Sequence, residues 1–336
     1  GGGGHTSEIL RRIDPEGRVI SFDRDSDAIA NKPDDERLTL IRSDFRWIQN
    51  HIIHQGYSEG IDGILADLGV SSHQFDTAER GFSFRYEAPL DMRMNQEAQT
   101  TAADIINSYS MEDLEKILRL YGEVDNSRKI AQLICKAREL SPINTTGELG
   151  KAIESVLPKF AEHKFLAKVY QALRIEVNQE MKSLEKFLIG AAKSLKPGGK
   201  LVIITYHSLE DRMVKNFIKA GNIDRRHTGK IAAKTFEFIS VTIQELNSES
   251  SGTAHTAVVG RGAADRDRNV SEASVEHSFH KFSSAVGGRV EGVAELLRNH
   301  RQAGSLCHLQ NRLRISKLSI IGSRFLHQRT MDFHKG

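Results

Sequence analysis

The residues of this chain best suited to chemistry lie between 61 and 94, where carboxylates, arginines, aromatics and amides stand close together. Asp67 follows an apolar run that starts at Ile61 and has the length of a buried parallel strand. Because α/β sheets bind ligands at the carboxyl ends of parallel strands, we expect Asp67 at a ligand site. Residues 80–94 fit no helical or strand period, which predicts a long ordered loop, and their Phe and Met content argues against disorder.

A second candidate is His207. It directly follows the apolar run 200–206, which we predict to be a buried strand after a helix that stops at 196–199. A lone histidine is more often structural than functional, but His207 would share a sheet edge with Asp67. Both roles for His207 therefore stay open.

Glycines open the sequence, as Gly1 to Gly4 followed by His5, ahead of a helix predicted to begin at Thr6. Glycines let a backbone approach a ligand closely, and the free N–H groups of a helix N-terminus bind anionic groups; the alternative is a flexible terminus. Asp23 ends the predicted strand 18–22, at the place where an acidic residue can hold a pair of ribose hydroxyls. Since such a glycine loop normally follows the first strand of a sheet, we expect the chain to be a fragment that lacks that strand.

Apolar runs that alternate with helical segments predict strands at 18–22, 38–41, 61–65 and 200–206. This alternation predicts an α/β fold with a parallel sheet of the nucleotide-binding kind. Phe45 lies just past the second strand, where it could pack against a bound base or belong to the core.

From about residue 100 to 195 the apolar spacing is helical, which is more helix than a plain nucleotide-binding fold contains. We therefore expect a helical subdomain inserted at 95–165, between core segments at 1–94 and 166–240.

Composition narrows the class of protein. The 336 residues exceed the usual size of one domain, and the net charge of +3 is so weakly basic that contact with nucleic acid must come from local patches. Cys135 and Cys307 make neither a disulfide framework nor a metal set, which favours a reducing, cytoplasmic location. No apolar run approaches the ~18 residues of a membrane span, and no signal peptide is evident.

Residues 241–336 are an atypical tail. From Ser248 onward the chain has no Pro and no Tyr, yet it contains half of the 14 histidines, without the spacing of metal ligands. We predict no metal site, and we expect the tail to be a disordered extension or an out-of-frame translation.

Several segments carry a family resemblance. The bacterial 16S rRNA (cytosine-N4) methyltransferase family closely resembles this chain in DGILADLGVSSHQFDTAERGFSFR, which starts at residue 62, and in PLDMRM, which starts at residue 89. QALRIEVN, KPGG and YHSLEDR resemble the same family in the same order, and the resemblance fades beyond residue 221. It implies a Rossmann-like fold that uses S-adenosylmethionine.

The resemblance also implies a cofactor site. Carried over by position, the residues that would hold S-adenosylmethionine are Gly3, Gly4, His5, Asp23, Phe45, Asp67 and Gln74. The cytosine amine is a poor nucleophile, and a hydrogen-bond acceptor would strengthen it during transfer. Many amino-methyltransferases place an Asn/Asp-Pro-Pro-aromatic segment here, whereas this chain has Asp-Leu-Gly-Val from residue 67. Asp67 is the first candidate for the acceptor, with His207 or Asp91 second.

The implied substrate is a cytidine in the decoding centre of 16S rRNA, on free RNA or on the small ribosomal subunit. A target base must leave its stack, and aromatics and arginines can receive it. The residues suited to that role are Arg80, Phe82, Phe84, Arg85 and Arg93, although the two phenylalanines could simply anchor the loop. A competing hypothesis is a non-catalytic RNA-binding or ribosome-assembly protein on a decayed methyltransferase scaffold. The sequence does not indicate an oligomeric state.

Overall fold

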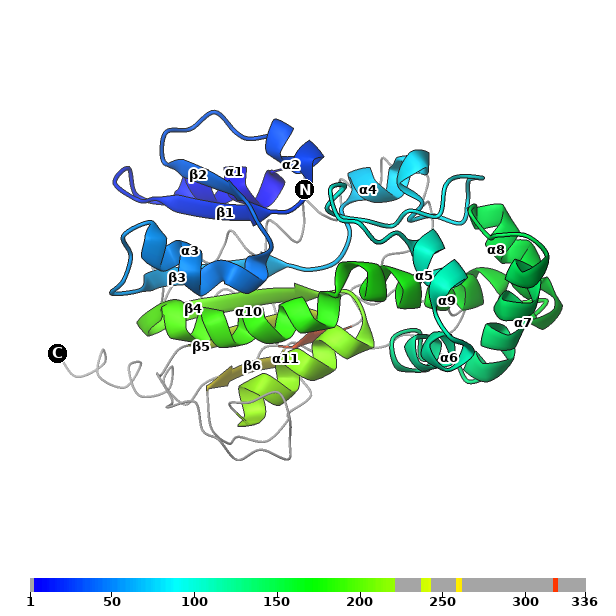
Figure 1. Cartoon of the computed structure of the whole chain (residues 1–336). Helices are drawn as coiled ribbons and strands as arrows, with labels where there is room; N and C mark the ends of the chain where they lie inside the picture. The colour runs from blue at the N-terminus through cyan, green and yellow to red at the C-terminus, as the bar shows by residue number, and fades with distance from the viewer. Residues whose placement is uncertain (1–2, 221–236, 243–257, 262–316, 320–336) are drawn as a thin grey trace.

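The computed structural model describes residues 3–220, 237–242, 258–261 and 317–319. Strands and helices alternate at the amino end, the middle is helical, and strands return after it (Figure 1). The strands are β1 (Val19–Asp23), β2 (Leu38–Arg42), β3 (Ile61–Asp67), β4 (Leu195–Thr205), β5 (Glu237–Thr242), β6 (Val258–Arg261) and β7 (Lys317–Ser319). The helices are α1 (Gly4–Arg12), α2 (Ser26–Ala30), α3 (Ile48–His54), α4 (Ser72–Asp76), α5 (Ala102–Ser108), α6 (Met111–Leu120), α7 (Ser127–Leu140), α8 (Thr146–Ile153), α9 (Glu162–Asn178), α10 (Glu180–Ser194) and α11 (Ser208–Ala220). Short 3₁₀ turns are η1 (Phe45–Trp47), η2 (Ala78–Arg80) and η3 (Glu154–Val156).

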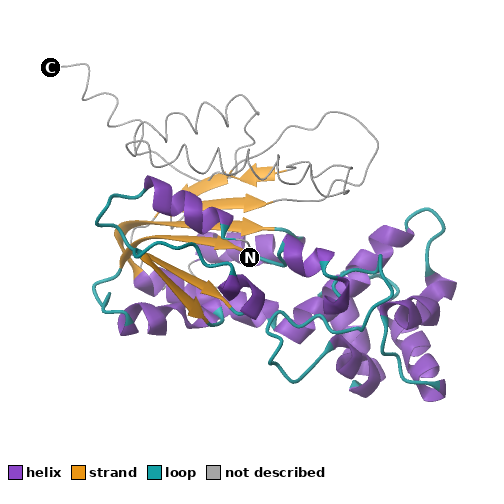
Figure 2. Ribbon diagram, turned by 90° about the horizontal axis from the view of Figure 1, so that it is seen from above, coloured by secondary structure: helices purple, strands orange, loops and turns teal. Residues whose placement is uncertain are grey.

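The described strands form two sheets. Strands β1 and β2 pair in parallel, and a second sheet has the order β3-β4-β5-β6, with β7 also paired to β5 (Figure 2). Within the second sheet β3, β4 and β5 are parallel, whereas β6 and β7 run antiparallel to β5. The α/β class with parallel strands is confirmed, although the sequence predicted one sheet.

One core lies between the β3–β4 sheet and the helices α3, α10 and α11. Strand β4 contributes Leu201 and Ile203, both fully buried, whereas Ile64 is the buried position of β3. The expectation of a buried strand at 61–65 therefore holds at one residue, because Asp62 and Gly63 are exposed.

A second hydrophobic core lies among the helices α5, α6, α7, α8 and α9. The loop predicted at 80–94 belongs to it, because Phe82, Leu90, Met92 and Met94 are all buried there. This burial explains why a loop without regular structure is ordered. The same core continues along α9 to Leu173, beyond the boundary expected at residue 165.

Among the described residues, no helix combines the length and the apolar character needed to cross a membrane. Most of the tail predicted from residue 241, together with Cys307, Gly1 and Gly2, lies outside the described residues.

Candidate active site

Asp67 stands at the end of β3, where three elements meet. Its Oδ1 accepts a hydrogen bond of 2.7 Å from the Tyr206 hydroxyl, and its Oδ2 lies 3.5 Å from His5 Nδ1. Tyr206 directly follows β4, and His5 belongs to α1. Gly69 lies in the turn after Asp67 and has a φ of +84°, a conformation that favours glycine. A Cβ at this position would lie 3.5 Å from the Tyr206 ring, which is an ordinary van der Waals contact. The structure thus brings together Asp67 and His5, two of the residues expected to hold the cofactor.

The Tyr206 hydroxyl is a permanent donor to Asp67. Burial, followed by the neighbouring Asp67 carboxylate, raises the pKa of Tyr206 far above its usual value of 10.0. The hydroxyl therefore keeps its proton at neutral pH. The Asp67 side chain is still 31% exposed, so the carboxylate remains accessible while it is held.

Helix α1 begins at Gly4, earlier than the predicted start at Thr6. Gly3 is its N-cap, with φ +73°, and no side chain caps the first turn. Thr6, where the helix was predicted to begin, therefore lies inside it. A helix N-terminus of this kind, without a side-chain cap, suits an anionic ligand group.

Asp23 and Phe45 lie at the ends of neighbouring strands. Asp23 is the last residue of β1, and its Oδ1 accepts a hydrogen bond of 2.9 Å from the Asp25 backbone N–H. Phe45 packs edge-on against Phe187, with ring centroids 5.2 Å apart. Phe45 thus has the core contact that was one of its two expected roles, and its contact with a base stays a prediction.

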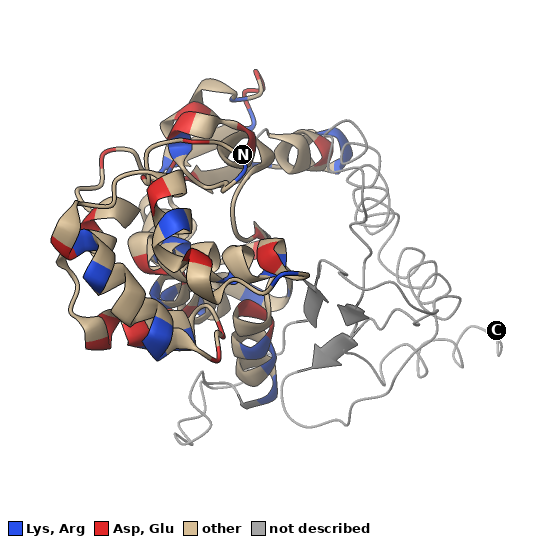
Figure 3. Ribbon diagram, turned by 90° about the vertical axis from the view of Figure 1, so that its right-hand side faces the viewer, with Lys and Arg blue, Asp and Glu red and all other residues tan. Residues whose placement is uncertain are grey.

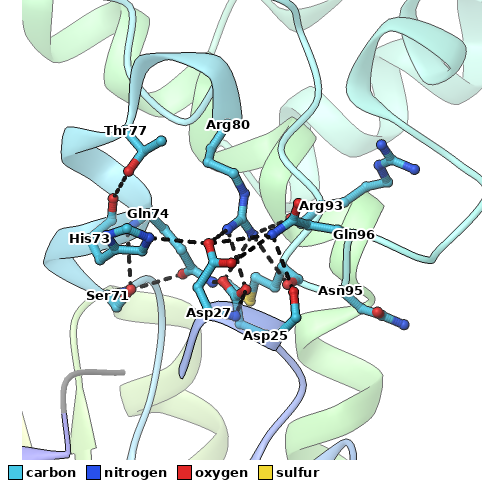
Figure 4. Close-up of polar contacts among 12 residues, drawn as sticks. Asp25, Asp27, Ser71, His73, Gln74, Thr77, Arg80, Arg93, Asn95 and Gln96 are labelled. Atoms are coloured by element: carbon cyan, nitrogen blue, oxygen red, sulfur yellow. Dashed lines mark hydrogen bonds and ion pairs between the residues drawn. The ribbon is translucent and has the colours of Figure 1, made fainter. Parts of the chain in front are cut away.

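Arg80 is the centre of a buried network between the two cores (Figure 4). Its guanidinium donates to Asp25 Oδ2 and to Asp27 Oδ2, each at 2.9 Å, and to the backbone oxygens of Arg93 and Met94 at 2.9 and 3.3 Å. The Arg80 side chain is only 8% exposed. Its donors are turned inward, toward carboxylates and carbonyls of the protein itself, and its contact with RNA stays a prediction.

Gln74 belongs to the same network. Its Oε1 accepts a hydrogen bond from the Ser71 backbone N–H, and its Nε2 donates to Asp25 Oδ2 at 2.5 Å. Gln74 is buried, and the direct cofactor contact expected for it stays a prediction. Asp25 itself is the N-cap of α2, as expected, and accepts from the backbone N–H of Asp27.

The aromatics of the loop anchor it. Phe82 is 4% exposed, and it lies 5.9 Å below the Arg80 guanidinium carbon. Phe84 packs edge-on against Tyr170 at 5.4 Å and near His163 at 5.7 Å. These contacts favour the alternative of loop anchoring for both Phe82 and Phe84, and their contact with RNA stays a prediction.

Among the charged loop residues, Arg93 and Asp91 hold each other. Arg93 donates two hydrogen bonds to the Asp91 carboxylate, at 2.8 and 2.7 Å, and one to the Ala98 oxygen at 2.6 Å. The Asp91 hydrogen bond raises the pKa of Arg93. Both oxygens of Asp91 are thereby occupied, which argues against Asp91 as the catalytic acceptor and against Arg93 as an RNA contact. Arg85, in contrast, is exposed.

His207 is buried in an ion-pair cluster. Its Nε2 lies 3.3 Å from Glu210 Oε1 but has no hydrogen-bond partner, and its Nδ1 accepts from the Glu210 backbone N–H at 3.4 Å. Glu180 completes a set of ligand-type atoms that lie within 4.8 Å of one another, but Arg174 donates to both oxygens of Glu180, at 2.8 and 3.0 Å. The cluster therefore has its own internal cation.

Burial raises the pKa of Glu210, but His207 and Arg174 more than offset this, and the pKa lies below its usual value. Glu210 also accepts from the Tyr206 backbone N–H at 2.9 Å. His207 is 8% exposed, and its place as a second candidate for the catalytic group stays a prediction. The cluster also holds the strand end that carries Tyr206.

Sequence reasoning missed Tyr206 and Asn178, although both stand in segments that carried the resemblance. Asn178 Nδ2 donates to the Met92 oxygen at 2.7 Å, and its Oδ1 accepts from the Met94 N–H at 2.8 Å. One side chain therefore fixes the loop against the end of α9. An alternation of buried and exposed positions could not have revealed this role, because the partners are 84 and 86 residues away.

An open cavity of about 480 Å³ adjoins the ends of β1 and β2. Its walls are Arg24, Arg42, Ser43, Asp44, Arg46, Asn95, Glu97, Ala98, Val177, Asn178 and Gln179. It provides room next to the positions of Asp23 and Phe45.

Known proteins resemble this chain over most of its length. Residues 1–243 match the family described as the MraW methylase family. The chain is 57% identical over 249 residues to ribosomal RNA small subunit methyltransferase H of Phocaeicola vulgatus, which covers 74% of this chain and 80% of that protein. The proteins of the same name from Parabacteroides distasonis and Flavobacterium johnsoniae are 54% and 51% identical, over 67% and 66% of this chain and 73% of each relative. The chain therefore belongs to the MraW methylase family.

Proposed function

We propose that this protein transfers a methyl group from S-adenosylmethionine to N4 of a cytidine in the decoding centre of 16S rRNA. The observation that supports this most directly is the held but accessible carboxylate of Asp67 at a strand end, beside the uncapped first turn of α1. The relatives named as small subunit rRNA methyltransferases support the reaction and the substrate. They give no support to the alternative of a non-catalytic assembly protein.

The residues at the amino end fit S-adenosylmethionine. The N-cap of α1 is Gly3, which has a positive φ and no side chain to cap the helix. Asp23 and Asp67 are the last residues of β1 and β3. We assign the cofactor to Gly3, Gly4, His5, Asp23, Phe45, Asp67 and Gln74, and Gln74 also donates a hydrogen bond to Asp25. Bound S-adenosylmethionine supplies an electrophilic methyl group on its sulfonium, so the protein contributes position and electrostatics.

Asp67 is the acceptor that we assign to the cytosine amine. A carboxylate that takes a hydrogen bond from that amine increases the electron density on its nitrogen, and it can take the proton that the amine loses on methylation. Tyr206 occupies Oδ1, so Oδ2 is the oxygen suited to this role. His5 is close enough to Oδ2 to orient it.

RNA contact rests on individual residues. Figure 3 shows lysines and arginines interspersed with aspartates and glutamates along the described helices, without one continuous basic strip. Arg85 is the exposed arginine of the loop, and we assign it to the RNA. We further propose that residues 1–94 and 166–240 form a methyltransferase core and that the helices within 95–165 form the subdomain that grips the RNA. We also propose that the protein acts in the cytoplasm.

The test is methyl transfer by this chain from tritiated S-adenosylmethionine to 16S rRNA and to small ribosomal subunits, with the product nucleoside identified by mass spectrometry. We expect N4-methylcytidine at one position, and loss of the signal in Asp67→Ala. RNA binding without transfer would support the assembly-protein hypothesis instead, and a different methylated nucleoside would refute the proposed chemistry.

A further inference from the structure

Three residues other than glycine have a left-handed backbone in the described chain: Met92, Glu123 and Gln179, with φ of 61°, 49° and 49°. A Cβ makes this conformation costly, so it persists only where surrounding contacts impose it, and such residues gather at functional sites. All three lie where the helical core meets the sheet core. Met92 accepts a hydrogen bond from Asn178, Gln179 separates α9 from α10, and Glu123 connects α6 with α7 and contacts α11.

Glu123 makes contacts that connect the helical region to α11. Its Oε2 accepts from Ser208 Oγ at 2.5 Å, and its Oε1 accepts from Arg212 Nη2 at 2.7 Å. Its backbone oxygen accepts from Lys168 Nζ at 3.0 Å. The hydrogen bond from Ser208 is the main reason that the pKa of Glu123 lies below its usual value, with Arg212 adding to it. The carboxylate is therefore ionised at neutral pH, next to the N-terminus of α11, where a negative charge is favourable.

The backbone next to Glu123 is closely packed. A Cβ on the preceding residue, Gly122, would come within 2.7 Å of the backbone oxygens of Leu118 and Lys168. The connection is thus wedged between the end of α6 and α9 while its side chain is tied to α11. The charge-assisted hydrogen bonds from Ser208 and Arg212 offset the energetic cost of the positive φ at Glu123.

Ser208 is two residues after Tyr206, whose hydroxyl holds Asp67. Glu123 itself lies between α6 and α7, whose hydrophobic core also contains the buried residues of the loop at 80–94, the site loop. Resting on the proposed function, we propose that Glu123 is a positioning residue that holds the helical region and its loop in register with the strand end carrying Tyr206, so that bound RNA is aligned with the methyl donor. Glu123 does not touch the reacting atoms.

Two substitutions at this position separate positioning from stability. Glu123→Ala and Glu123→Gly both delete the carboxylate, but the glycine also removes the strain, so Glu123→Gly should have the higher urea midpoint of the two. Misalignment of about 1 Å can lower turnover on the order of 100-fold, so we expect both variants to lose 10- to 100-fold in kcat on small ribosomal subunits. Affinity for S-adenosylmethionine, measured by calorimetry, should stay within about twofold of wild type in both, because Glu123 acts on RNA alignment.

The matched control is Asp125→Ala, which removes an exposed carboxylate from the same connection and should leave kcat unchanged. A kcat that recovers in Glu123→Gly along with the urea midpoint would reduce Glu123 to a stabilising residue and overturn the proposal. An equal loss of cofactor affinity would overturn it as well.

Hydrogen exchange tests the contact between Glu123 and α11 without depending on the proposed reaction. The amides of the first turn of α11 should exchange faster in both Glu123 variants than in Asp125→Ala. Absence of methyl transfer by the wild-type chain would refute the proposed function, and unchanged exchange at α11 would refute the coupling itself.

Discussion

Replacement of Arg80 by methionine tests the buried network that joins the amino-terminal strands to the site loop. Methionine keeps an unbranched apolar side chain but removes the guanidinium donors with which Arg80 binds Asp25, Asp27 and the loop carbonyls. Asp25 is 3% exposed, and after the change it retains hydrogen bonds from Gln74 and from the Asp27 backbone N–H alone.

The cost follows from the burial of that carboxylate. Removing one partner of a buried ion pair typically destabilises a protein by about 3–5 kcal/mol, because it leaves an uncompensated charge. The two hydrogen bonds that Asp25 keeps place the expected loss near the lower end, about 3 kcal/mol. With a urea dependence of about 3 kcal/mol per molar for a chain of this size, the unfolding midpoint should fall by about 1 M.

Circular dichroism during urea unfolding measures this shift, with Arg85→Met as the matched control. Arg85 is an exposed arginine in the same loop, so its replacement should change stability by less than about 0.5 kcal/mol. The double variant Arg80→Met with Asp25→Asn should recover part of the loss, since it removes the unpaired charge. An Arg80→Met midpoint equal to that of Arg85→Met, or a double variant less stable than Arg80→Met, would refute the reasoning.

The pH dependence of the difference follows from Asp25. Burial raises the pKa of Asp25, but hydrogen bonds from Arg80 and Gln74 outweigh this and hold it below its usual 3.8. A carboxyl whose pKa is lowered by folding stabilises the folded protein above the unfolded pKa, and this contribution is lost as the pH falls through the folded pKa. The gap in stability between wild type and Arg80→Met should therefore be full at pH 7 and narrow below about pH 4.

Three further substitutions test the assignments at the site. Asp23→Ala should weaken binding of S-adenosylmethionine by about 1–3 kcal/mol, the scale of hydrogen bonds to a charged group, and an unchanged affinity by calorimetry would remove Asp23 from the site. Arg85→Met should weaken binding to 16S rRNA and reduce its salt dependence by about one phosphate contact, whereas an identical salt slope would show that Arg85 does not touch the RNA. Asp67→Asn should lower kcat far more than RNA affinity; if turnover survives and the cofactor dissociation constant rises instead, Asp67 is a cofactor ligand and not the acceptor.

The sequence predicted the parts of the fold that follow from local periodicity. The apolar runs become β1 to β4, and Asp23 and Asp67 stand at strand ends because a strand boundary is visible in the chain itself. The helical spacing predicted up to residue 195 is interrupted at Gln179, whose left-handed backbone ends α9. No local pattern marks that break.

Arg80 and Arg85 show why the site could be predicted only in part. They are the same residue type, five positions apart in one loop, yet one is buried and the other exposed. What distinguishes them is Asp25, which is 55 residues away from Arg80. A composition suited to RNA recognition therefore identified the loop, but only the tertiary partners show which arginine is free to face a ligand.

The geometry around Asp67 makes the outcome of Asp67→Asn interpretable. The Tyr206 hydroxyl keeps its proton, so it needs an acceptor, and the carbonyl oxygen of an asparagine would turn toward it. The amide NH₂ would then occupy the place of Oδ2 and present donors to the site. A cytosine amine is itself a donor, so the variant would oppose two donors and lose the hydrogen bond that activates the nucleophile. Because Tyr206 fixes which end of the amide faces inward, loss of turnover in Asp67→Asn reports the role of Oδ2 and not a rotated side chain.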